Sequence, residues 1–401
     1  MAAVSELRGE YRPPVPSRVI FGRDRVSDLG QELGQLGSKR VLLLSGRTVA
    51  EKTDAVARVK SALGDACIGV YSGLTQRAPI ATAVEATRLA LDGKVDTLVG
   101  VGGSTISDAA RMIGVMMVEG ITSEGRLREL GRQFDGLLEP DLTGKQLPWQ
   151  VSIPTTLSAG EFNRGGGNIL DDQAGHKIRV RHPDIYAHLI VLDPEMTVGT
   201  PDWLWLSTGV KAMDHCIERL YGRGNQPATD ATTLMAAELL FNYLPKSGEN
   251  FGDLNARMQC LIAAWLSMMG APSVGSGLSH GLGHVIGVRY GIGHGYTSCV
   301  TQPYVMEYNR PASAHQQALL ARAAGVDIRG MGDEAAAEAA ARVVDEFIMG
   351  LGMPHRLRDL EVPREDFSEI AELTLRDGAG RNNPVAIIDK EQVIQVLEMA
   401  W

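Results

Sequence analysis

The sequence has few of the features that mark disulfide-rich, membrane-spanning or nucleic-acid-binding proteins. Its four cysteines form no Cys-x-x-Cys pair, so we expect free thiols in a reducing compartment. No apolar run is long enough to span a bilayer, and because the first residues carry charges and prolines we expect no signal peptide there. A formal net charge of −9 disfavours nucleic acid and membranes as partners. We therefore expect a cytoplasmic protein that acts on small molecules.

The first half of the chain alternates short apolar runs with helical stretches, of which residues 82–93 are the clearest. This pattern predicts an α/β domain with a parallel sheet covered on both faces. The strands are expected at residues 40–46, 66–73, 95–103, 148–156 and 187–194. Residues 119–147 are polar and without clear periodicity, so we expect a loop over a site there.

After Pro194 the sequence changes to helical patterns separated by glycine or proline, with no convincing strand. The 401 residues suffice for two domains. We therefore predict an α/β domain over residues 1–195 and an all-helical domain over residues 196–401.

A glycine-rich stretch, "VGVGGSTISDAARMI" (99–113), follows one apolar strand and opens a helix. Gly102 and Gly103 would let the backbone approach a pyrophosphate, and free N–H groups at Ser104 favour an anion. The spacing is not Gly-x-Gly-x-x-Gly, so an ordinary strand–helix turn is the alternative.

A second polar turn, "IPTTLSAGEFNRGGGN" (153–168), also ends a strand. Thr155 and Thr156 offer hydroxyls there, and the glycines at 165–167 predict a flexible turn. Two such loops at the carboxyl edge of a parallel sheet fit a ligand site.

Four of the nine histidines fall in two short segments. His280 and His284 share one helical face, His294 follows a glycine-rich break, and His215 lies four residues after Lys211. Neutral imidazoles around one cavity would suit Zn²⁺ or Fe²⁺, whereas the alternative is histidines of the core or the substrate site. We favour a shared site, but a lysine stands at 211, where a carboxylate would complete a metal site.

Together these segments resemble the iron-containing alcohol dehydrogenase superfamily. "VGGSTISDAAR" resembles its GGGSxxDxxK loop, "IPTT" its second cofactor loop, and "GSGLSHGLGHVIGVRYGIGHG" its histidine signature. "PSRVIFGRDRVSDL", "VLDPEMTVGTP" and the ending "NNPVAIIDKEQVIQVLEMAW" extend the resemblance along nearly the whole chain. "VYSGLTQRAPI" is similar to the maleylacetate reductase branch.

The resemblance implies a dinucleotide-binding α/β domain, an all-helical domain and an active site in the cleft between them. It also implies hydride transfer between NAD(P)H and a small alcohol or carbonyl. Mapped residue by residue, it assigns cofactor contacts to Gly46, Arg47, Gly102, Gly103, Ser104, Asp108, Thr155, Thr156 and Lys177. In the family an acidic residue after the first strand disfavours a 2′-phosphate. Gly46 and Arg47 stand there instead, which favours NADP(H) over NAD(H).

The resemblance places His215, His280 and His294 on the family's three histidine ligands and His284 on a histidine near the substrate. Lys211 takes the place of the aspartate ligand, and Arg111 that of the lysine in the glycine loop. An ammonium beside a divalent cation is repulsive, so we expect no metal; if one is present, its ligands are the three histidines.

Three roles for Lys211 are open. It could replace the charge of the metal and polarise a carbonyl, which we favour. It could act as a base or form a Schiff base, or it could turn to Asp214 or Glu218 in a vestigial site. The preferred function is NAD(P)H-dependent reduction of a small carbonyl, with His284 or His280 as proton donor. The alternative is a non-redox enzyme centred on Lys211.

The segment "PSRVIFG" would supply an edge strand that must be paired or covered. Because relatives in this family are commonly dimers, we expect a homodimer. Arg164, Arg179 and Arg289 are candidates to hold a substrate carboxylate, although solvation at the surface is the alternative for each.

Overall fold

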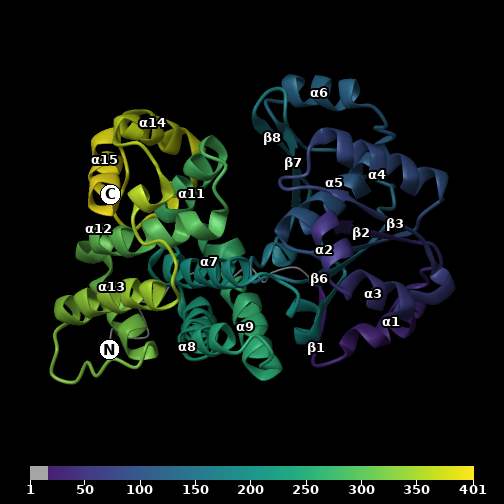
Figure 1. The fold of residues 1–401 in the computed structure, drawn as a ribbon. Coiled ribbons are helices and arrows are strands. Elements are labelled where there is room, and N and C mark those ends of the chain that lie inside the picture. The colour runs from purple at the N-terminus through teal and green to yellow at the C-terminus, as the bar shows by residue number, and fades with distance from the viewer. Residues whose placement is uncertain (1–16) are drawn as a thin grey trace. The chain divides into compact units, whose positions relative to one another are not determined.

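The structure is a computed structural model, and it describes residues 17–401. These residues divide after Pro201 into two compact units (Figure 1). The predicted boundary near residue 195 falls within the short 3₁₀ helix η5 (Pro194–Thr197), shortly before this division.

The first unit contains a six-stranded sheet in which every neighbouring pair of strands is parallel. All five strands predicted from apolar runs are present in it, and a sixth, β1, lies at one edge beside β9. The strand order across the sheet is β1 (Arg18–Phe21), β9 (Leu189–Leu192), β6 (Trp149–Pro154), β4 (Thr97–Gly102), β2 (Val41–Gly46) and β3 (Cys67–Leu74).

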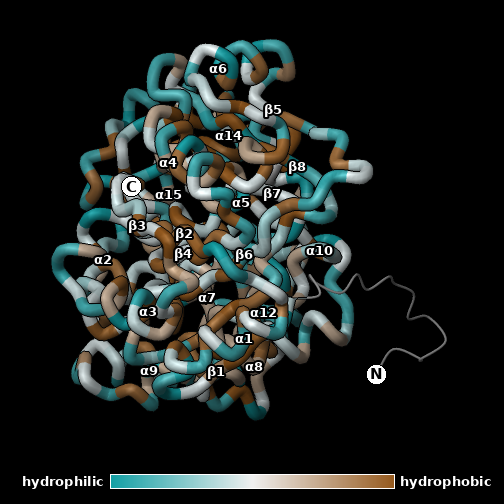
Figure 2. Tube along the Cα trace, turned by 90° about the vertical axis from the view of Figure 1, so that its right-hand side faces the viewer, coloured by the Kyte–Doolittle hydropathy of each residue, from teal (hydrophilic) through white to brown (hydrophobic). Residues whose placement is uncertain are grey.

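The central strands β2 and β4 are buried on both faces, because their apolar side chains alternate between two cores. Leu42 and Leu44 pack on one face against α4 and α5, whereas Val41 and Leu43 pack on the other against α1 and α3. The hydrophobic colouring along β2 and β4 in Figure 2 follows this burial. The helices of this unit are α1 (Leu29–Leu36), α2 (Arg47–Lys52), α3 (Ala55–Leu63), α4 (Ile80–Asp92), α5 (Ser104–Glu119) and α6 (Glu124–Gln133).

The strand order reverses at β2, because the chain continues to β3 on one side and then returns to β4 on the other. In open parallel sheets such a reversal opens a crevice at the carboxyl ends of the strands, where ligands bind. The strands β2, β4 and β6 end there at Gly46, Gly102 and Pro154. The two predicted glycine and threonine loops therefore start at one edge of the sheet.

Two expectations about loops are wrong. Residues 119–147 are not a plain loop, since they contain α6 and the short strand β5 (Leu137–Leu138). The glycines at 165–167 do not make a flexible turn, because Gly166 begins the strand β7 (Gly166–Asp171). Together with β8 (His176–Arg181), these strands form a second, three-stranded sheet in the order β5-β8-β7.

The second unit is helical from Asp202 to the C-terminus, as the sequence predicts. One core holds α11, α12, α14 and α15 together through residues such as Leu282, Val300, Ile370 and Val396. Among the described residues no single helix is long and apolar enough to cross a membrane. The two segments Leu254–Val274 and Leu278–Arg289, which are bent against each other, reach the necessary length and apolar composition only when they are counted together. The helices are α7 (Asp202–Tyr221), α8 (Pro227–Glu249), α9 (Leu254–Ser267), α10 (Ala271–Val274), α11 (Leu278–Arg289), α12 (His294–Ala323), α13 (Asp333–Gly350), α14 (Phe367–Asp377) and α15 (Lys390–Ala400).

The small sheet packs so closely on α5 that β7 requires a glycine. A Cβ atom at Gly167 would lie 2.6 Å from the backbone oxygen of Asp108 and 2.9 Å from the backbone nitrogen of Met112. We predict that Gly167→Ala lowers the free energy of unfolding by about 1–3 kcal/mol, the usual cost of overpacking. The measurement is urea unfolding followed by circular dichroism.

Gly34→Ala on α1 is the matched control, because no atom lies within 4 Å of its added Cβ. We expect this variant to be as stable as the wild type or more so, since alanine favours helices. A Gly167→Ala protein as stable as Gly34→Ala would contradict the close packing of β7 on α5.

Candidate functional site

The first loop of the candidate cofactor site joins β4 to α5 with the backbone tightly folded. Gly102 has a φ of +153°, and a Cβ atom there would lie 2.6 Å from Cγ1 of Ile106. Gly103 precedes the first turn of α5, which begins at Ser104. The free N–H groups of a helix N-terminus therefore follow the end of a central strand, the arrangement that binds phosphate groups.

The second loop lies directly against the first. A Cβ atom at Gly103 would approach Oγ1 of Thr156 to 3.0 Å, and one at Gly160 would approach Cβ of Ser104 to 2.6 Å. Thr155 and Thr156 are 4% and 5% exposed, and the hydroxyl of Thr156 lies 3.1 Å from that of Ser158. The structure thus brings both predicted loops together in one unit.

Arg111 ties α5 to the second loop. Its guanidinium donates from two nitrogens to the carbonyl of Gly160, both at 3.0 Å, and it pairs with Asp108 on the same helix. Asp108 also accepts a 2.7 Å hydrogen bond from Asn168 on β7. Arg111 therefore links α5 to the second loop, and Asp108 links α5 to β7.

The remaining predicted cofactor residues lie at two places. Gly46 ends β2, and the exposed Arg47 opens α2, so both lie at the carboxyl edge of the large sheet. Lys177 lies on β8, exposed on the small sheet rather than at that edge. The cofactor roles of these residues stay predictions.

In the helical unit the four predicted histidines lie in one cluster with His280 at its centre. The ring of His280 lies 5.0 Å from that of His215, 5.2 Å from that of His294 and 6.1 Å from that of His284, measured between centroids. His284 and His294 stack on each other at 5.2 Å. Three helices supply these rings: α7 carries His215, α11 carries His280 and His284, and α12 begins at His294.

One face of α7 carries four ionisable residues at helical spacing, namely Lys211, Asp214, His215 and Glu218. Asp214, His215 and Glu218 are at most 4% exposed, and Lys211 is half-buried. Lys211 therefore lies on the same face as the predicted site histidine His215.

Burial sets the charge states of this face. Loss of water raises the pKa of Asp214 to about 7, with the charge of Glu218 adding to the shift. It also raises the pKa of Glu218, lowers that of His280 to about 3 and lowers that of His215 well below its ordinary value. Near neutral pH His215 and His280 are therefore uncharged imidazoles.

His284 differs from the buried histidines because its side chain is 46% exposed. Its Nδ1 lies 3.0 Å and 3.2 Å from the two carboxylate oxygens of Asp377 at the end of α14. This pairing orients the ring and leaves Nε2 for exchange with a substrate or water.

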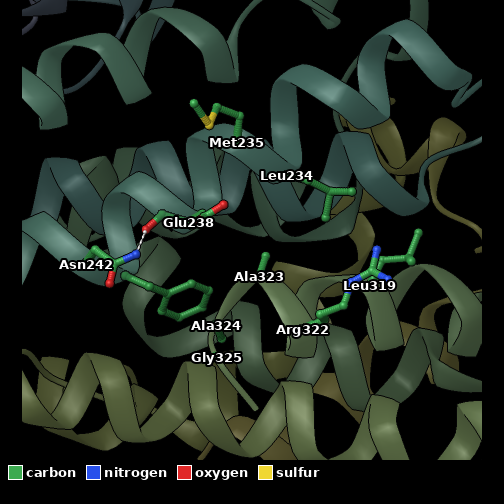
Figure 3. A pocket seen from close by; sticks show the side chains of 10 residues that line it. Leu234, Met235, Glu238, Asn242, Leu319, Arg322, Ala323, Ala324 and Gly325 are labelled. Carbon is green, nitrogen blue, oxygen red and sulfur yellow. Dashed lines mark hydrogen bonds between the residues drawn. The ribbon is translucent and has the colours of Figure 1, made fainter. Parts of the chain in front are cut away.

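Other groups lie outside this cluster. Arg289, a candidate for a substrate carboxylate, pairs with Asp366 and Glu369. A hollow of about 450 Å³ between residues of α8 and α12 is lined by Glu238, Phe241 and Arg322 among others (Figure 3). None of the predicted site residues lines that hollow.

Sequence reasoning missed three carboxylates that contact the histidine cluster. Asp214 and Glu218 were considered only as partners of Lys211, although their spacing on α7 places them on the same face. Asp377 lies 93 residues from His284 in the sequence, and no local pattern could have connected them.

Profiles of one family match both units. Residues 16–194 match the profile "Iron-containing alcohol dehydrogenase", and residues 205–401 match "Fe-containing alcohol dehydrogenase family, C-terminal". The chain belongs to the iron-containing alcohol dehydrogenase family, and it is an NAD(P)H-dependent dehydrogenase or reductase. It is 30% identical to "Dehydrogenase ALT3" of Alternaria alternata, over 91% of this chain and 99% of that protein.

Solved structures share the fold. A 1,3-propanediol oxidoreductase superposes with a TM-score of 0.89 at 26% identity, covering 98% of this chain and 100% of that one. A maleylacetate reductase from Agrobacterium tumefaciens superposes with a TM-score of 0.78 at 24% identity, with 98% of each chain covered, which is a likeness of fold. The predicted fold class is thereby confirmed.

We predict that Arg111→Met destabilises the protein by about 3–5 kcal/mol, because it leaves Asp108 without its buried cationic partner. The same change should weaken NADPH binding, because the loop after β6 would no longer be hydrogen-bonded to α5, the helix that follows the loop after β4. Thermal unfolding and fluorescence titration measure the two effects.

Arg126→Met on α6 is the matched control, because Arg126 makes an exposed ion pair with Glu129. We expect it to cost less than about 1 kcal/mol. Equal stability of the two variants would show that Arg111 does not hold the loops.

Proposed function

We propose that this protein reduces a small carbonyl or a related unsaturated substrate with NAD(P)H, without a metal. The observation that carries the proposal is the cluster of four imidazole rings around His280, with Lys211 one helical turn before His215. Family membership supplies the oxidoreductase class. Carboxylate-bearing carbonyls, as in the maleylacetate reductase branch, belong to the proposed substrates.

The residues at the edge of the large sheet suit a dinucleotide. The N–H groups after Gly102 and Gly103 would hold the pyrophosphate, and Thr155 and Thr156 would lie near the nicotinamide. When bound, the reduced nicotinamide supplies the hydride. Arg47 at the start of α2 would meet the 2′-phosphate of NADP(H) as a charge-assisted donor.

The residues present do not fit the family's iron. A site of that kind takes one aspartate and three histidines, whereas Lys211 brings an ammonium that repels a divalent cation. Among the described residues, His215, His280 and His294 do not form a group whose ligand atoms all lie within 4.8 Å of one another. Asp214, Glu218 and His280 do form such a group.

In the proposed reaction Lys211 polarises the carbonyl oxygen of the substrate, the task that a Lewis acid would otherwise perform. The uncharged His215 and His280 add no competing positive charge beside it. Either His284 or His280 delivers the proton that converts the developing alkoxide to an alcohol. His284 has the better access, because it is half-exposed and paired with Asp377.

We further propose a cytoplasmic homodimer. Free thiols suit a reducing compartment, and all four cysteines are unbridged. The strand β1 lies at the edge of the large sheet, and the edge of a sheet is where a strand of a second copy can be added.

We predict that NADPH binds at least as tightly as NADH, and that NADPH is consumed when a small aldehyde or keto acid is added. Arg47→Glu should weaken NADPH binding about ten- to hundredfold and leave NADH binding nearly unchanged, because charge-assisted bonds contribute about 1.5–3 kcal/mol. Fluorescence titration and the absorbance of NADPH measure both outcomes.

Lys52→Glu, at the other end of α2, is the control for Arg47→Glu, since it makes the same charge change away from the strand end. NADH bound tenfold more tightly than NADPH by the wild type would contradict the cofactor preference. No consumption of either nucleotide with any carbonyl would contradict the function itself.

For Lys211 we predict far less than one zinc or iron per purified chain, and activity that chelators leave unchanged. Lys211→Ala should lower kcat by about 100- to 1,000-fold, because a preorganised charge is lost. Lys211→Asp should replace the repelling ammonium with a carboxylate and so gain metal affinity, with the imidazole rings turning toward the ion. Elemental analysis and steady-state kinetics measure these effects.

Lys246→Ala, an exposed lysine of α8, is the control and should keep full activity. A covalent adduct on Lys211 after borohydride treatment with substrate would favour the Schiff-base role instead. Stoichiometric metal in the wild type, or full activity in Lys211→Ala, would show that the charge of Lys211 does not replace a metal.

A further inference from the structure

Two buried carboxylates lie beside one nitrogen of His280. Nδ1 of His280 is 3.0 Å from Oε2 of Glu218 and 3.5 Å from Oδ2 of Asp214. Asp214 is fully buried, and Glu218 and His280 are 2% and 7% exposed. The ring at the centre of the histidine cluster therefore has acceptor oxygens on its Nδ1 side and little access to water.

Glu218 also holds the backbone of the helix that carries this ring. Its Oε2 accepts a 2.8 Å hydrogen bond from the N–H of Gly277, and its Oε1 accepts one of 3.2 Å from the N–H of His280. A Cβ atom at Gly277 would lie only 2.9 Å from Oε1, so glycine permits this approach. One carboxylate from α7 thus fixes both the first turn of α11 and the ring of His280.

Within residues 17–401, Oδ1 of Asp214 and Nδ1 of His280 find no hydrogen-bond partner of acceptable geometry. Both oxygens of Glu218 accept backbone N–H groups and therefore act as acceptors here, so the nitrogen of His280 that faces Oε2 is the one that carries the hydrogen. A small rotation of the ring would direct an Nδ1–H group at Glu218 and satisfy the buried nitrogen.

We propose that Glu218, assisted by Asp214, is a positioning residue that holds His280 as the Nδ1–H tautomer and keeps Nε2 unprotonated. This inference rests on the proposed function. An unprotonated Nε2 accepts a hydrogen bond and cannot release a proton. His280 therefore serves as a hydrogen-bond acceptor at the centre of the site and is not the group that supplies the proton for the reduction.

The same three side chains could instead hold a divalent cation, but their surroundings disfavour one. Glu218 already accepts two backbone N–H groups, and Oδ2 of Asp214 accepts the hydroxyls of Ser298 and Ser279 at 2.6 Å and 3.1 Å. Donor hydrogens directed at the same oxygens compete with a cation. The buried Arg219 next to Glu218 adds a positive charge.

The tautomer can be observed directly in the full chain. Protein labelled with ¹⁵N-histidine and treated with chelator is recorded in two-bond ¹H–¹⁵N correlation spectra, with His280→Gln used for assignment. We expect the Nδ1–H pattern for His280. His188 is an internal reference for the opposite tautomer, because the backbone N–H of Gln150 donates to its Nδ1 at 3.1 Å.

An Nε2–H or doubly protonated His280 would overturn the proposal. So would a cation on Nδ1 that persists after chelation and removes the Nδ1–H signal. This measurement needs no substrate, so it separates a failure of the inference from a failure of the proposed reductase activity.

Variants test the consequence for catalysis. In Glu218→Gln the amide can present an N–H group to Nδ1 and convert His280 to the Nε2–H form. We expect kcat to fall on the order of 10- to 100-fold, as for other partners of functional histidines, with the NADPH dissociation constant unchanged. Glu218→Asp, which keeps the acceptor charge, should restore the tautomer and part of kcat.

Asp193→Asn is the matched control for loss of stability. Asp193 is fully buried and accepts the backbone N–H groups of Val26 and Glu195, as Glu218 accepts those of α11. We expect both variants to melt earlier and only Glu218→Gln to lose kcat per folded molecule. Unchanged kcat in Glu218→Gln, or an equal loss in Asp193→Asn, would overturn the positioning role.

Discussion

The helical unit depends on keeping a stripe of ionisable side chains away from water. Asp214, His215 and Glu218 lie on one face of α7 and are almost completely buried. Buried charges are costly unless hydrogen bonds or opposite charges compensate them. Here the compensation comes from the N-terminal turn of α11, from serine hydroxyls and from the histidine rings. The buried carboxylate of Glu218 thus also holds the first turn of α11 in place.

The close approach of these three helices requires glycine where they meet around the rings. A Cβ atom at Gly283 on α11 would lie 2.7 Å from Cε1 of His294, and one at Gly295 on α12 would lie 2.6 Å from the backbone of Ser207 on α7. The glycine-rich spacing of the histidine segment is therefore a packing requirement as well as a family signature. It allows imidazoles from three helices to lie within ring contact of His280.

Much of the fold could be predicted because apolar runs report burial directly. The strands β2 and β4 are largely apolar stretches, and they are buried on both faces. The helix α6 and the strand β5 were missed because one is polar and the other has only two residues. The strand β7 was misread because its glycines serve contact with α5 rather than flexibility.

The candidate site, like the fold, could be predicted from the sequence only in part. Histidines at helical spacing could be placed together from the sequence, since the period of a helix is known. The role of Arg111 could not be predicted from the sequence, because only the fold brings the carbonyl of Gly160 close enough for it to bind. Long-range partners such as Asp377 carry no local signal.

The proposed replacement of the metal by a lysine would keep the net charge of the site unchanged. A divalent cation with one aspartate carries one net positive charge, and so does a lysine ammonium alone. A substrate oxygen would therefore meet the same net charge in either arrangement. The lysine differs in placing that charge on a flexible chain, so its position depends on what surrounds it. A neutral imidazole can accept a hydrogen bond from an ammonium, and His215, one helical turn after Lys211 on the buried face of α7, supplies one.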